Sequence, residues 1–372
     1  ITLSDHPAGA HMLGGLEHGF EYSDCWVDDA RLVVLNARDA AQHGAQIRLH
    51  EPLTKARRDD DGHWLLETPQ GQYRARSLVN AAGPKADDLA QIAGEKPAYG
   101  IRRVRGSHIV VKRRLEHDYG YILQLPDTRI CFVLPFAQGM TLIGTTDADH
   151  TGDPVEAEAS EEEITYLLNA FDSYFDLPLS RDQVVHSYAG VRALVDDGEG
   201  RPEAATRGYR LVLSDDAAGA PSLGIYGGKI TSYRHLAQEA VDMLAGRLDS
   251  LAGPQWTADK PLPGGDFAID GQADLIAGLA RDYPFLSGFD AERIGRAYGT
   301  DARKWLGDAA SRKALGRDFG CGFSEAELTW LREKEWACTA EDVLWRRTKL
   351  GLHLSAQQQQ ELAEFMNALA SG

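Results

Sequence analysis

The chain has 372 residues, of which 43% are hydrophobic and 26% charged, so it is long and apolar enough for two domains with buried cores. Acidic residues outnumber Lys and Arg by 56 to 39, and the net charge of −17 disfavours nucleic acid and anionic lipid surfaces as partners. The sequence holds no apolar run of about 18 residues that could cross a bilayer, and its four scattered cysteines follow no zinc-ligand spacing, so no metal site is predicted.

The first predicted element is an amphipathic helix over residues 28–41, where apolar residues recur at helical spacing and Gly44 follows as a stop. Alternating or β-branched residues then predict four strands, at 46–50, 54–58, 63–68 and 72–80. The last strand runs into Asn80-Ala81-Ala82-Gly83, where small residues let the backbone approach a bulky ligand. Small residues also end many strands that bind nothing, so this turn alone leaves both readings open.

Residues 101–194 are rich in β-branched and aromatic runs separated by charged turns, which is typical of a mostly antiparallel sheet. The clearest runs lie at 109–111, 121–123, 130–134 and 141–144. One helix interrupts them, because Ser160 and Glu163 form a capping box ahead of apolar residues at helical spacing.

A glycine pair joins the next strand to a helix. After a strand at 209–214, the run 223–226 meets Gly227-Gly228-Lys229 and continues as a long amphipathic helix. Unpaired amides and the dipole at a helix start favour a bound anion, and Lys229 adds a positive charge there. A solvated lysine after a glycine turn is the alternative reading.

Beyond about residue 253 the sequence becomes helical. Three prolines mark a linker, and Ser324, Thr339 and Ser355 each resemble the first residue of a helix. We therefore expect boundaries at 1–252, 253–264 and 265–372, with residues 92–200 forming mainly the antiparallel sheet.

Two polar residues at the edges of predicted strands are candidates for chemistry. His108 lies in Arg105-Gly106-Ser107-His108, and Arg192 ends Ala189-Gly190-Val191-Arg192. A histidine can take the proton of an alcohol while hydride leaves the adjacent carbon, and an arginine can bind phosphate with two donors. The chain has 12 histidines, however, and most single histidines are surface or packing residues.

Six segments in one order across almost the whole chain carry a family resemblance. They are 19–32 (GFEYSDCWVDDARL), 105–111 (RGSHIVV), 144–147 (GTTD), 188–192 (YAGVR), 227–234 (GGKITSYR) and 344–349 (LWRRTK). Together they resemble successive motifs of the respiratory, FAD-dependent glycerol-3-phosphate dehydrogenases. The stretch after Pro254 resembles that family's linker into its C-terminal helical domain.

The resemblance implies an α/β (α+β) flavoprotein: an incomplete FAD-binding mixed sheet with an antiparallel substrate-binding sheet, plus a C-terminal all-helical domain. Residues 1–252 would bind FAD and substrate. The implied reaction is oxidation of sn-glycerol 3-phosphate to dihydroxyacetone phosphate by hydride transfer to FAD, with electrons passed to a membrane quinone. The implied location is cytoplasmic and peripheral, on the inner face of the cytoplasmic membrane, with a homodimer as one possible assembly.

Residue roles follow from position in the motifs. The resemblance implies that His108 activates the C2 hydroxyl and that Arg192 binds substrate and stabilises the developing alkoxide. Lys229 would lie near the flavin carbonyl or the substrate phosphate, so all three are candidate catalytic and substrate-binding residues. The candidate cofactor-binding residues are Ala81, Ala82, Gly83, Gly228, Lys229, Ile230 and Thr231.

The sequence departs from the family at two points. It begins at Ile1 and contains no G-x-G-x-x-G turn, so we expect a C-terminal fragment that binds FAD poorly and turns over nothing measurable by itself. Lys85 stands where the family usually has tryptophan, which places that local flavin contact in question. Two other functions stay open: a glycerol-3-phosphate oxidase that uses oxygen, and a noncatalytic module for assembly or membrane docking.

Overall fold

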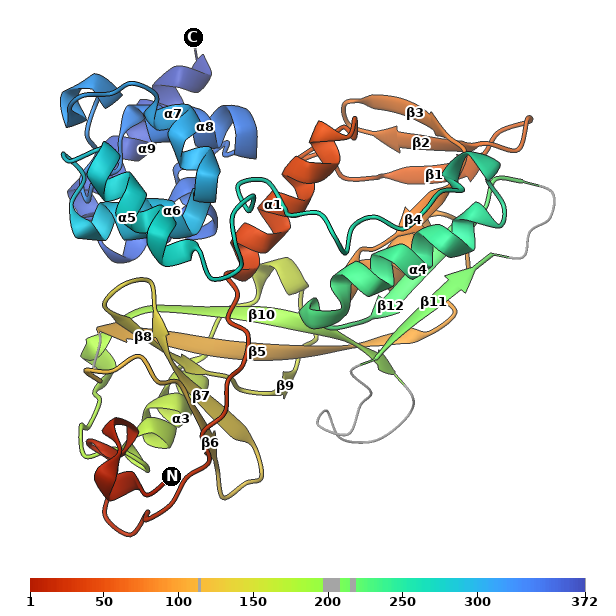
Figure 1. The fold of residues 1–372 in the computed structure, drawn as a ribbon. Helices are drawn as coiled ribbons and strands as arrows, with labels where there is room; N and C mark the ends of the chain where they lie inside the picture. Colours follow the sequence, from red (N-terminus) through yellow and green to blue (C-terminus); the bar gives the residue numbers. More distant parts are fainter. Residues whose placement is uncertain (113–114, 197–207, 215–218, 372) are drawn as a thin grey trace. The chain divides into compact units, whose positions relative to one another are not determined.

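The computed structural model describes residues 1–112, 115–196, 208–214 and 219–371 (Figure 1). The chain forms two compact units. We call Ile1–Glu21 with His50–Ala258 the sheet unit, and Tyr22–Leu49 with Asp259–Gly372 the helical unit. None of the described helices is long and apolar enough to cross a membrane.

The largest sheet of the sheet unit is antiparallel throughout, as the β-branched runs predict. Its order is β10-β5-β8-β7-β6, and β9 also pairs with β5. The strands are β5 (Gly100–Lys112), β6 (Tyr121–Gln124), β7 (Ile130–Phe136), β8 (Met140–Gly144), β9 (Ala148–Asp149) and β10 (Val184–Asp196). Figure 1 shows β5 and β10 as two long neighbouring ribbons. Residues 197–200, the end of the predicted 92–200 region, lie outside the described residues.

Helix α3 (Glu161–Asp172) covers one face of this sheet. Its buried Ile164, Leu167 and Phe171 share a core with Ile109 and Ile143 of the sheet. The predicted capping box is present, since Ser160 and Glu163 exchange side-chain and backbone hydrogen bonds. Side chains alternate between the two faces of a strand, so His108 and its neighbours two residues away lie on the opposite face.

A second sheet of the same unit is mixed. Its order is β11-β12-β4, with β12 (Ser222–Gly227) parallel to β4 (Leu78–Asn80) and antiparallel to β11 (Tyr209–Leu213). Helix α4 (Tyr233–Ala245) packs Ala240 and Leu244 on Leu223 of β12. Figure 1 shows α4 lying along β12 and β11. Mixed sheet, antiparallel sheet and a separate helical region together confirm the predicted fold class.

A third, antiparallel sheet consists of β1 (Lys55–Arg58), β2 (Trp64–Thr68) and β3 (Gly71–Ala75). Trp64 is fully buried, and its indole N–H donates to the carbonyl of Pro221 at 3.1 Å.

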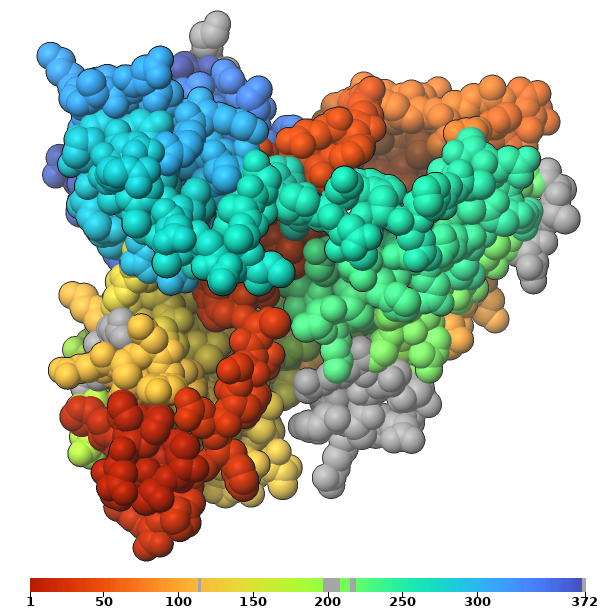
Figure 2. Space-filling view, in the orientation of Figure 1, coloured from red at the N-terminus to blue at the C-terminus, as the bar shows by residue number. Residues whose placement is uncertain are grey.

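Residues 1–21 pack on the antiparallel sheet region of the same unit, where Met12 pairs with Phe175 and Tyr121 donates to the carbonyl of Ala8. Figure 2 shows this amino-terminal segment in red beside the yellow strands.

Three predicted elements differ in the structure. Residues 46–50 form no strand, because no strand in the described ranges pairs with them and an extended segment needs a hydrogen-bonded neighbour. The predicted strand 72–80 divides into β3 and β4, which belong to different sheets. The helix after the glycine pair begins at Tyr233, since a 3-10 turn over Ile230–Ser232 uses the Lys229 carbonyl as the acceptor for Ser232.

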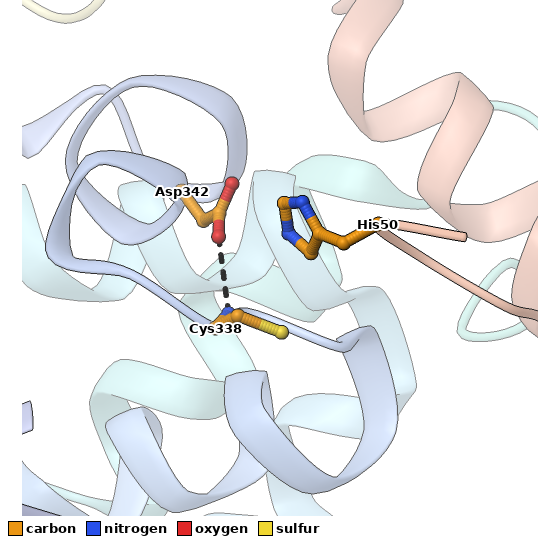
Figure 3. A group of neighbouring side chains, drawn as sticks. All are labelled: His50, Cys338 and Asp342. Carbon is orange, nitrogen blue, oxygen red and sulfur yellow. Dashed lines mark hydrogen bonds between the residues drawn. The ribbon is translucent and has the colours of Figure 1, made fainter. Parts of the chain in front are cut away.

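The helical unit holds α1 and the C-terminal helices. They are α1 (Asp29–Gln42), α5 (Gln272–Asp282), α6 (Gly288–Tyr298), α7 (Ala302–Leu306), α8 (Glu325–Glu335) and α9 (Ala356–Ser371). The predicted helix starts are confirmed: Ser324 accepts from the Glu327 amide, and Ser355 exchanges hydrogen bonds with Gln358. Asp342 opens a π-helical turn, Asp342–Arg347, and accepts from the Cys338 amide at 3.0 Å (Figure 3).

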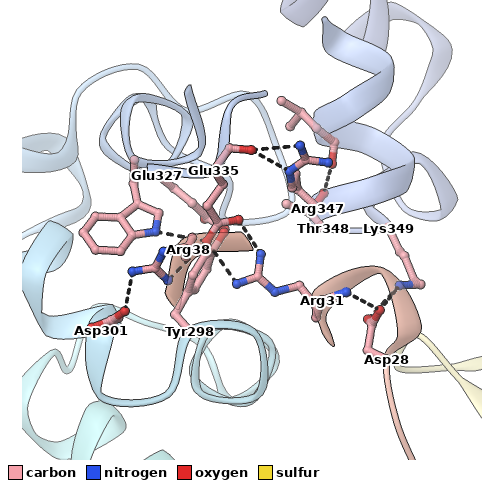
Figure 4. A network of polar contacts seen from close by, with 12 residues as sticks. Asp28, Arg31, Arg38, Tyr298, Asp301, Glu327, Glu335, Arg347, Thr348 and Lys349 are labelled. Atoms are coloured by element: carbon pink, nitrogen blue, oxygen red, sulfur yellow. Dashed lines mark hydrogen bonds and ion pairs between the residues drawn. The ribbon is translucent and has the colours of Figure 1, made fainter. Parts of the chain in front are cut away.

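Helix α1 belongs to the helical unit, although the sequence boundaries place it in the region 1–252. Buried charges hold it there (Figure 4). The Arg31 guanidinium forms a two-pronged ion pair with Glu335, and Arg38 pairs with Asp301 at 2.6 Å. Removing one partner of such a buried pair leaves an uncompensated charge, so these contacts fix α1 on the C-terminal helices.

Asp28 is expected to contribute to this attachment, since it caps α1 and pairs with Lys349. Its carboxylate accepts from the Arg31 amide at 3.2 Å and from the Lys349 ammonium at 2.6 Å (Figure 4). Asp28→Ala should lower the free energy of unfolding by about 1–2 kcal/mol, measured by urea unfolding followed through tryptophan fluorescence. Asp28→Asn should retain the cap. The exposed neighbour provides the control: Asp29→Ala should cost ~0.5 kcal/mol, and an equal loss in both alanine variants would contradict the assignment.

Candidate functional site

His108 lies on the face of the antiparallel sheet that α3 does not cover. Strand pairing places it opposite Tyr188 of β10 and opposite Gly144 of β8. Its imidazole stacks on the Tyr188 ring, with centroids 5.1 Å apart and planes 10° from parallel. On its other side it lies over Gly144, where an added Cβ would come within 2.2 Å of the ring. The ring is therefore held by an aromatic neighbour and by the absence of a side chain at residue 144.

A pair of glycines lies next to His108 on the same face. Gly106 of β5 and Gly190 of β10 are directly opposite each other, one pleat from the His108–Tyr188 pair, or about 7 Å along the strands. A Cβ at Gly190 would meet nothing within 4 Å. We call Gly106 and Gly190 the glycine floor; Gly190 leaves open space above the sheet, whereas the side chains of Arg192 and Thr145 lie over Gly106.

Arg192 lies on the side of Gly190 away from the His108–Tyr188 pair. It is two residues beyond Gly190 on β10, so it shares the face of His108. Its guanidinium bends back over the floor, since an added Cβ at Gly106 would lie 2.7 Å from Nη2. Asp147 accepts from Nη1 at 2.6 Å and Thr145 accepts from Nη2 at 3.1 Å. The sheet thus brings together an imidazole and an oriented guanidinium that are 84 residues apart in sequence.

The segment Thr145–Thr146–Asp147 follows β8 and contacts both faces of the sheet. Thr145 and Asp147 contact Arg192, whereas Thr146 between them is buried and donates to Glu163 of α3 at 2.7 Å. Burial opposes ionisation of Glu163, but hydrogen bonds from the Ser160 amide and the Thr146 hydroxyl lower its pKa below the usual value. Glu163 is therefore a carboxylate at neutral pH.

Lys229 and the Ala81–Gly83 turn lie at one edge of the mixed sheet. Parallel neighbours end at the same edge, and Asn80 at the end of β4 pairs with Gly224 of β12. Three residues further, β12 ends at Gly227, where a Cβ would lie 3.0 Å from the Val195 side chain of β10. Lys229 follows, is exposed, and has no ion-pair partner among the described residues.

The backbone at this edge has the conformations that glycine favours. Gly83, Gly227 and Gly228 have φ values of +56°, +74° and +111°. Asn80 supports the turn by donating to the carbonyl of Ala86 at 2.7 Å. Ile230 and Thr231 follow Lys229 in the 3-10 turn and are both exposed. The edge can therefore take a bulky or anionic ligand against main chain that carries few side chains.

Lys85 forms an ion pair and offers no flat aromatic surface at this edge. Its ammonium pairs with Asp153 at 2.9 Å, and the preceding Pro84 carbonyl accepts from Arg103 at 2.7 Å. Lys85 thus ties the turn to the segment after β9, and the Pro84 carbonyl ties it to β5.

The sequence offered His108 and Arg192 as candidates but not the residues that contact them. Tyr188, Gly144, Thr145 and Asp147 lie inside motifs that the sequence analysis quoted without giving these residues a role. Side chains two residues apart on a strand share a face, so the spacing of Tyr188, Gly190 and Arg192 could have placed all three on one face of the sheet. The contact between Thr146 and Glu163 had no such signal, because it joins a loop to a helix.

Comparisons with known proteins agree with this architecture. Residues 4–271 match the family model of FAD dependent oxidoreductases, and residues 255–371 match the C-terminal domain of alpha-glycerophosphate oxidase. The chain is 43% identical to the aerobic glycerol-3-phosphate dehydrogenase of Escherichia coli K12, over 94% of this chain and 71% of that protein. It is 41% identical to the D-erythritol 1-phosphate dehydrogenase of Brucella abortus, over 99% of this chain and 74% of that protein.

A solved structure shares the fold as well. The glycerol-3-phosphate dehydrogenase of Bacillus halodurans, complexed with FAD, superposes with a TM-score of 0.73 at 25% identity. The match covers 93% of this chain and 72% of that one.

Proposed function

We infer that this chain, which belongs to the family of FAD-dependent glycerol-3-phosphate dehydrogenases, oxidises sn-glycerol 3-phosphate to dihydroxyacetone phosphate. One observation carries the proposal. The imidazole of His108 and the guanidinium of Arg192 lie on a single face of the sheet, with the guanidinium over Gly106 and open space over the neighbouring Gly190. A proton acceptor and an anion-binding group thus lie on either side of a space that holds no side chain at Gly190.

The residues at the edge of the mixed sheet fit FAD. Gly83 and Gly228 have positive φ values, which glycine favours, and a Cβ at Gly83 would meet no atom within 4 Å. We propose that Ala81–Gly83 and Gly228–Thr231 hold the flavin, with Lys229 offering a positive charge to it. A cation at this position stabilises negative charge on a reduced ring. Bound FAD would supply the acceptor for the hydride.

The protein's own residues account for the rest of the reaction. The C2–H bond breaks with its electron pair, and the O–H bond loses its proton to the imidazole of His108 as the C2 carbonyl forms. Arg192 binds the substrate and stabilises the negative charge that develops on the C2 oxygen. Asp147 and Thr145 hold the guanidinium in place while the charge forms. Lys229 is the cation that we propose for the flavin carbonyl or the substrate phosphate.

We extend the proposal to the electron acceptor and location. A membrane quinone would reoxidise the flavin, with the protein attached peripherally at the inner face of the cytoplasmic membrane. The net charge of −17 opposes attachment through the whole surface, so a local apolar or basic patch would make the contact. Reduction of a quinone analogue without stoichiometric peroxide supports this acceptor, whereas peroxide formed mole for mole with product supports an oxidase.

A second substrate is favoured by one specific observation. A relative almost as similar as the E. coli enzyme acts, by its name, on D-erythritol 1-phosphate, which has one more carbon. The open space at Gly190 is compatible with a longer polyol phosphate. Values of kcat/KM for both compounds under one set of conditions would distinguish the two substrates, and we expect glycerol 3-phosphate to give the higher value.

Cofactor binding provides a prediction for the chain itself. Residues 1–372 contain no G-x-G-x-x-G turn, the segment that normally places a helix N-terminus at the pyrophosphate, so they should bind FAD weakly by themselves. Joining such a βαβ segment ahead of Ile1 should restore yellow flavin absorbance in a titration with FAD. Protein that stays colourless and gains no thermal stability from FAD, even with that segment, would support a noncatalytic module instead.

A further inference from the structure

We propose that Glu163, on the covered face of the antiparallel sheet, is a positioning residue that holds Arg192 in its working orientation through the segment Thr145–Thr146–Asp147. This inference rests on the proposed function, because it assigns Glu163 to the site in which Arg192 binds the substrate. The sequence accounts for Glu163 only as part of the capping box at the start of α3.

Successive side chains of the segment Thr145–Thr146–Asp147 face opposite sides of the antiparallel sheet. Thr145 and Asp147 both accept from the Arg192 guanidinium, at 3.1 and 2.6 Å. Thr146 lies between them and is buried with 2% of its surface exposed. Any shift of Thr146 therefore moves the two acceptors of Arg192 on either side of it.

Thr146 has two fixed partners on the covered face. Its hydroxyl donates to Glu163 at 2.7 Å and accepts from the amide of Ser107 at 2.9 Å. Ser107 is the β5 residue between Gly106 and His108, so the same hydroxyl ties the segment to the strand that carries the candidate base. Hydrogen bonds to a charged acceptor are stronger than neutral ones, which makes the Glu163 contact the firmer of the two.

Glu163 is itself fixed from three directions. Arg105 pairs with its carboxylate at 2.8 Å, and the amide of Ser160 donates to it at 3.0 Å. The third contact is the Thr146 hydroxyl. Helix capping alone requires only the Ser160 contact, so the other two partners are in excess of a cap. They connect the start of α3 to the segment that orients Arg192.

The substitution Glu163→Gln isolates the charge, because glutamine can still cap the helix. We expect it to lower kcat/KM for glycerol 3-phosphate by about 10-fold or more in FAD-loaded protein that carries the added βαβ segment, since a misplacement near 1 Å can reduce rates by about 10²-fold. Thr146→Val should give a similar loss, and Thr146→Ser, which retains the hydroxyl, should remain within about 2-fold of the unsubstituted protein.

Two controls come from the same helix start. Glu161 is exposed and pairs with Arg181 on the surface, so Glu161→Gln should leave kcat/KM unchanged. Ser160→Ala removes the hydroxyl that caps the Glu163 amide but leaves the contact of Glu163 with Thr146. It should lower the melting temperature and leave kcat/KM unchanged, which separates loss of the cap from loss of positioning.

A double-mutant cycle with Arg192 decides the proposal. If Glu163 acts through Arg192, then Glu163→Gln should produce no further loss in an Arg192→Met background. The same cycle, read as the Kd for glycerol 3-phosphate by calorimetry, provides a measurement that needs no turnover. Equal losses in both backgrounds, or an unchanged kcat/KM in the single variant, would overturn the positioning role. Protein that carries the added βαβ segment and intact Glu163 and Arg192, and that neither binds nor oxidises glycerol 3-phosphate, would instead refute the proposed function.

Discussion

Arg192→Met should lower kcat/KM for glycerol 3-phosphate by about 10²–10³-fold in FAD-loaded protein that carries the added βαβ segment, the loss typical when one preorganised donor to a developing oxyanion is removed. The structure gives the reason: the guanidinium is bent back over the glycine floor and held there by Asp147 and Thr145. Methionine keeps much of the length of the side chain but offers no hydrogen-bond donor. Steady-state assays with a dye acceptor measure the effect.

Arginine substitution at the surface provides the matched control for this prediction. Arg181 belongs to the same unit and pairs with the exposed Glu161, so Arg181→Met should leave kcat/KM unchanged. Asp147→Asn should give an intermediate loss, because asparagine accepts one hydrogen bond but carries no charge. If Arg192→Met retained more than about a third of kcat/KM, where a donor to the transition state should be worth 10²-fold or more, Arg192 would have no role at the reacting oxygen.

His108→Asn should have an effect of similar size. Loss of a positioned proton acceptor lowers kcat by about 10²–10⁴-fold, and asparagine preserves the polarity but cannot accept the hydroxyl proton. Thermal unfolding should change little, because the His108 ring stands beside Tyr188 at a half-buried position and not in the apolar core. His43→Asn, at an exposed position of the helical unit, should leave kcat unchanged.

Gly144 allows the same site to be disturbed without removing the imidazole. An alanine Cβ there would overlap the His108 ring, so Gly144→Ala should displace the ring and lower kcat. Gly139→Ala is the comparison for glycine substitution on the turn before β8, because a Cβ there meets no atom, although its positive φ introduces strain. Full activity in the Gly144 variant would show that the ring is not held where the reaction requires it.

The sheets were predictable from the sequence because local patterns determine them. The β-branched runs at 109–111 and 141–144 lie within β5 and β8, and the Ser160–Glu163 cap defines where α3 begins, so residue type and capping were enough to place these elements. Residues 46–50 show the limit of such patterns. They have the alternation of a strand, but pairing depends on a distant neighbour that a local window does not contain.

Domain membership was harder to predict for the same reason. Helix α1 is amphipathic, as predicted, yet its place on the C-terminal helices depends on buried pairs of Arg31 and Arg38 with residues about 300 and 260 positions away. Nothing local distinguishes an arginine that is exposed on a helix from one that pairs with Glu335. The boundaries at 252 and 264 for binding flavin and substrate stay predictions.

The candidate site shows the same limit: local patterns indicate residues, but contacts between distant segments orient them. Motif order indicated His108, Arg192 and Lys229 but not how they are oriented, because Tyr188, Asp147 and Glu163 contribute contacts that form only after β5, β8, β10 and α3 pack together. The structure brings His108 and Arg192 to one face of the antiparallel sheet. Lys229 lies two residues after the end of β12, whose last residue, Gly227, lies next to Val195 of β10. The roles of all three stay proposals.

A crystal structure of the FAD-loaded protein with glycerol 3-phosphate tests the central claim most directly. We predict that the substrate lies over Gly190, with its C2 hydroxyl within hydrogen-bond distance of the His108 imidazole and with Arg192 donating to it. Substrate bound elsewhere, with neither His108 nor Arg192 in contact with it, would contradict the account.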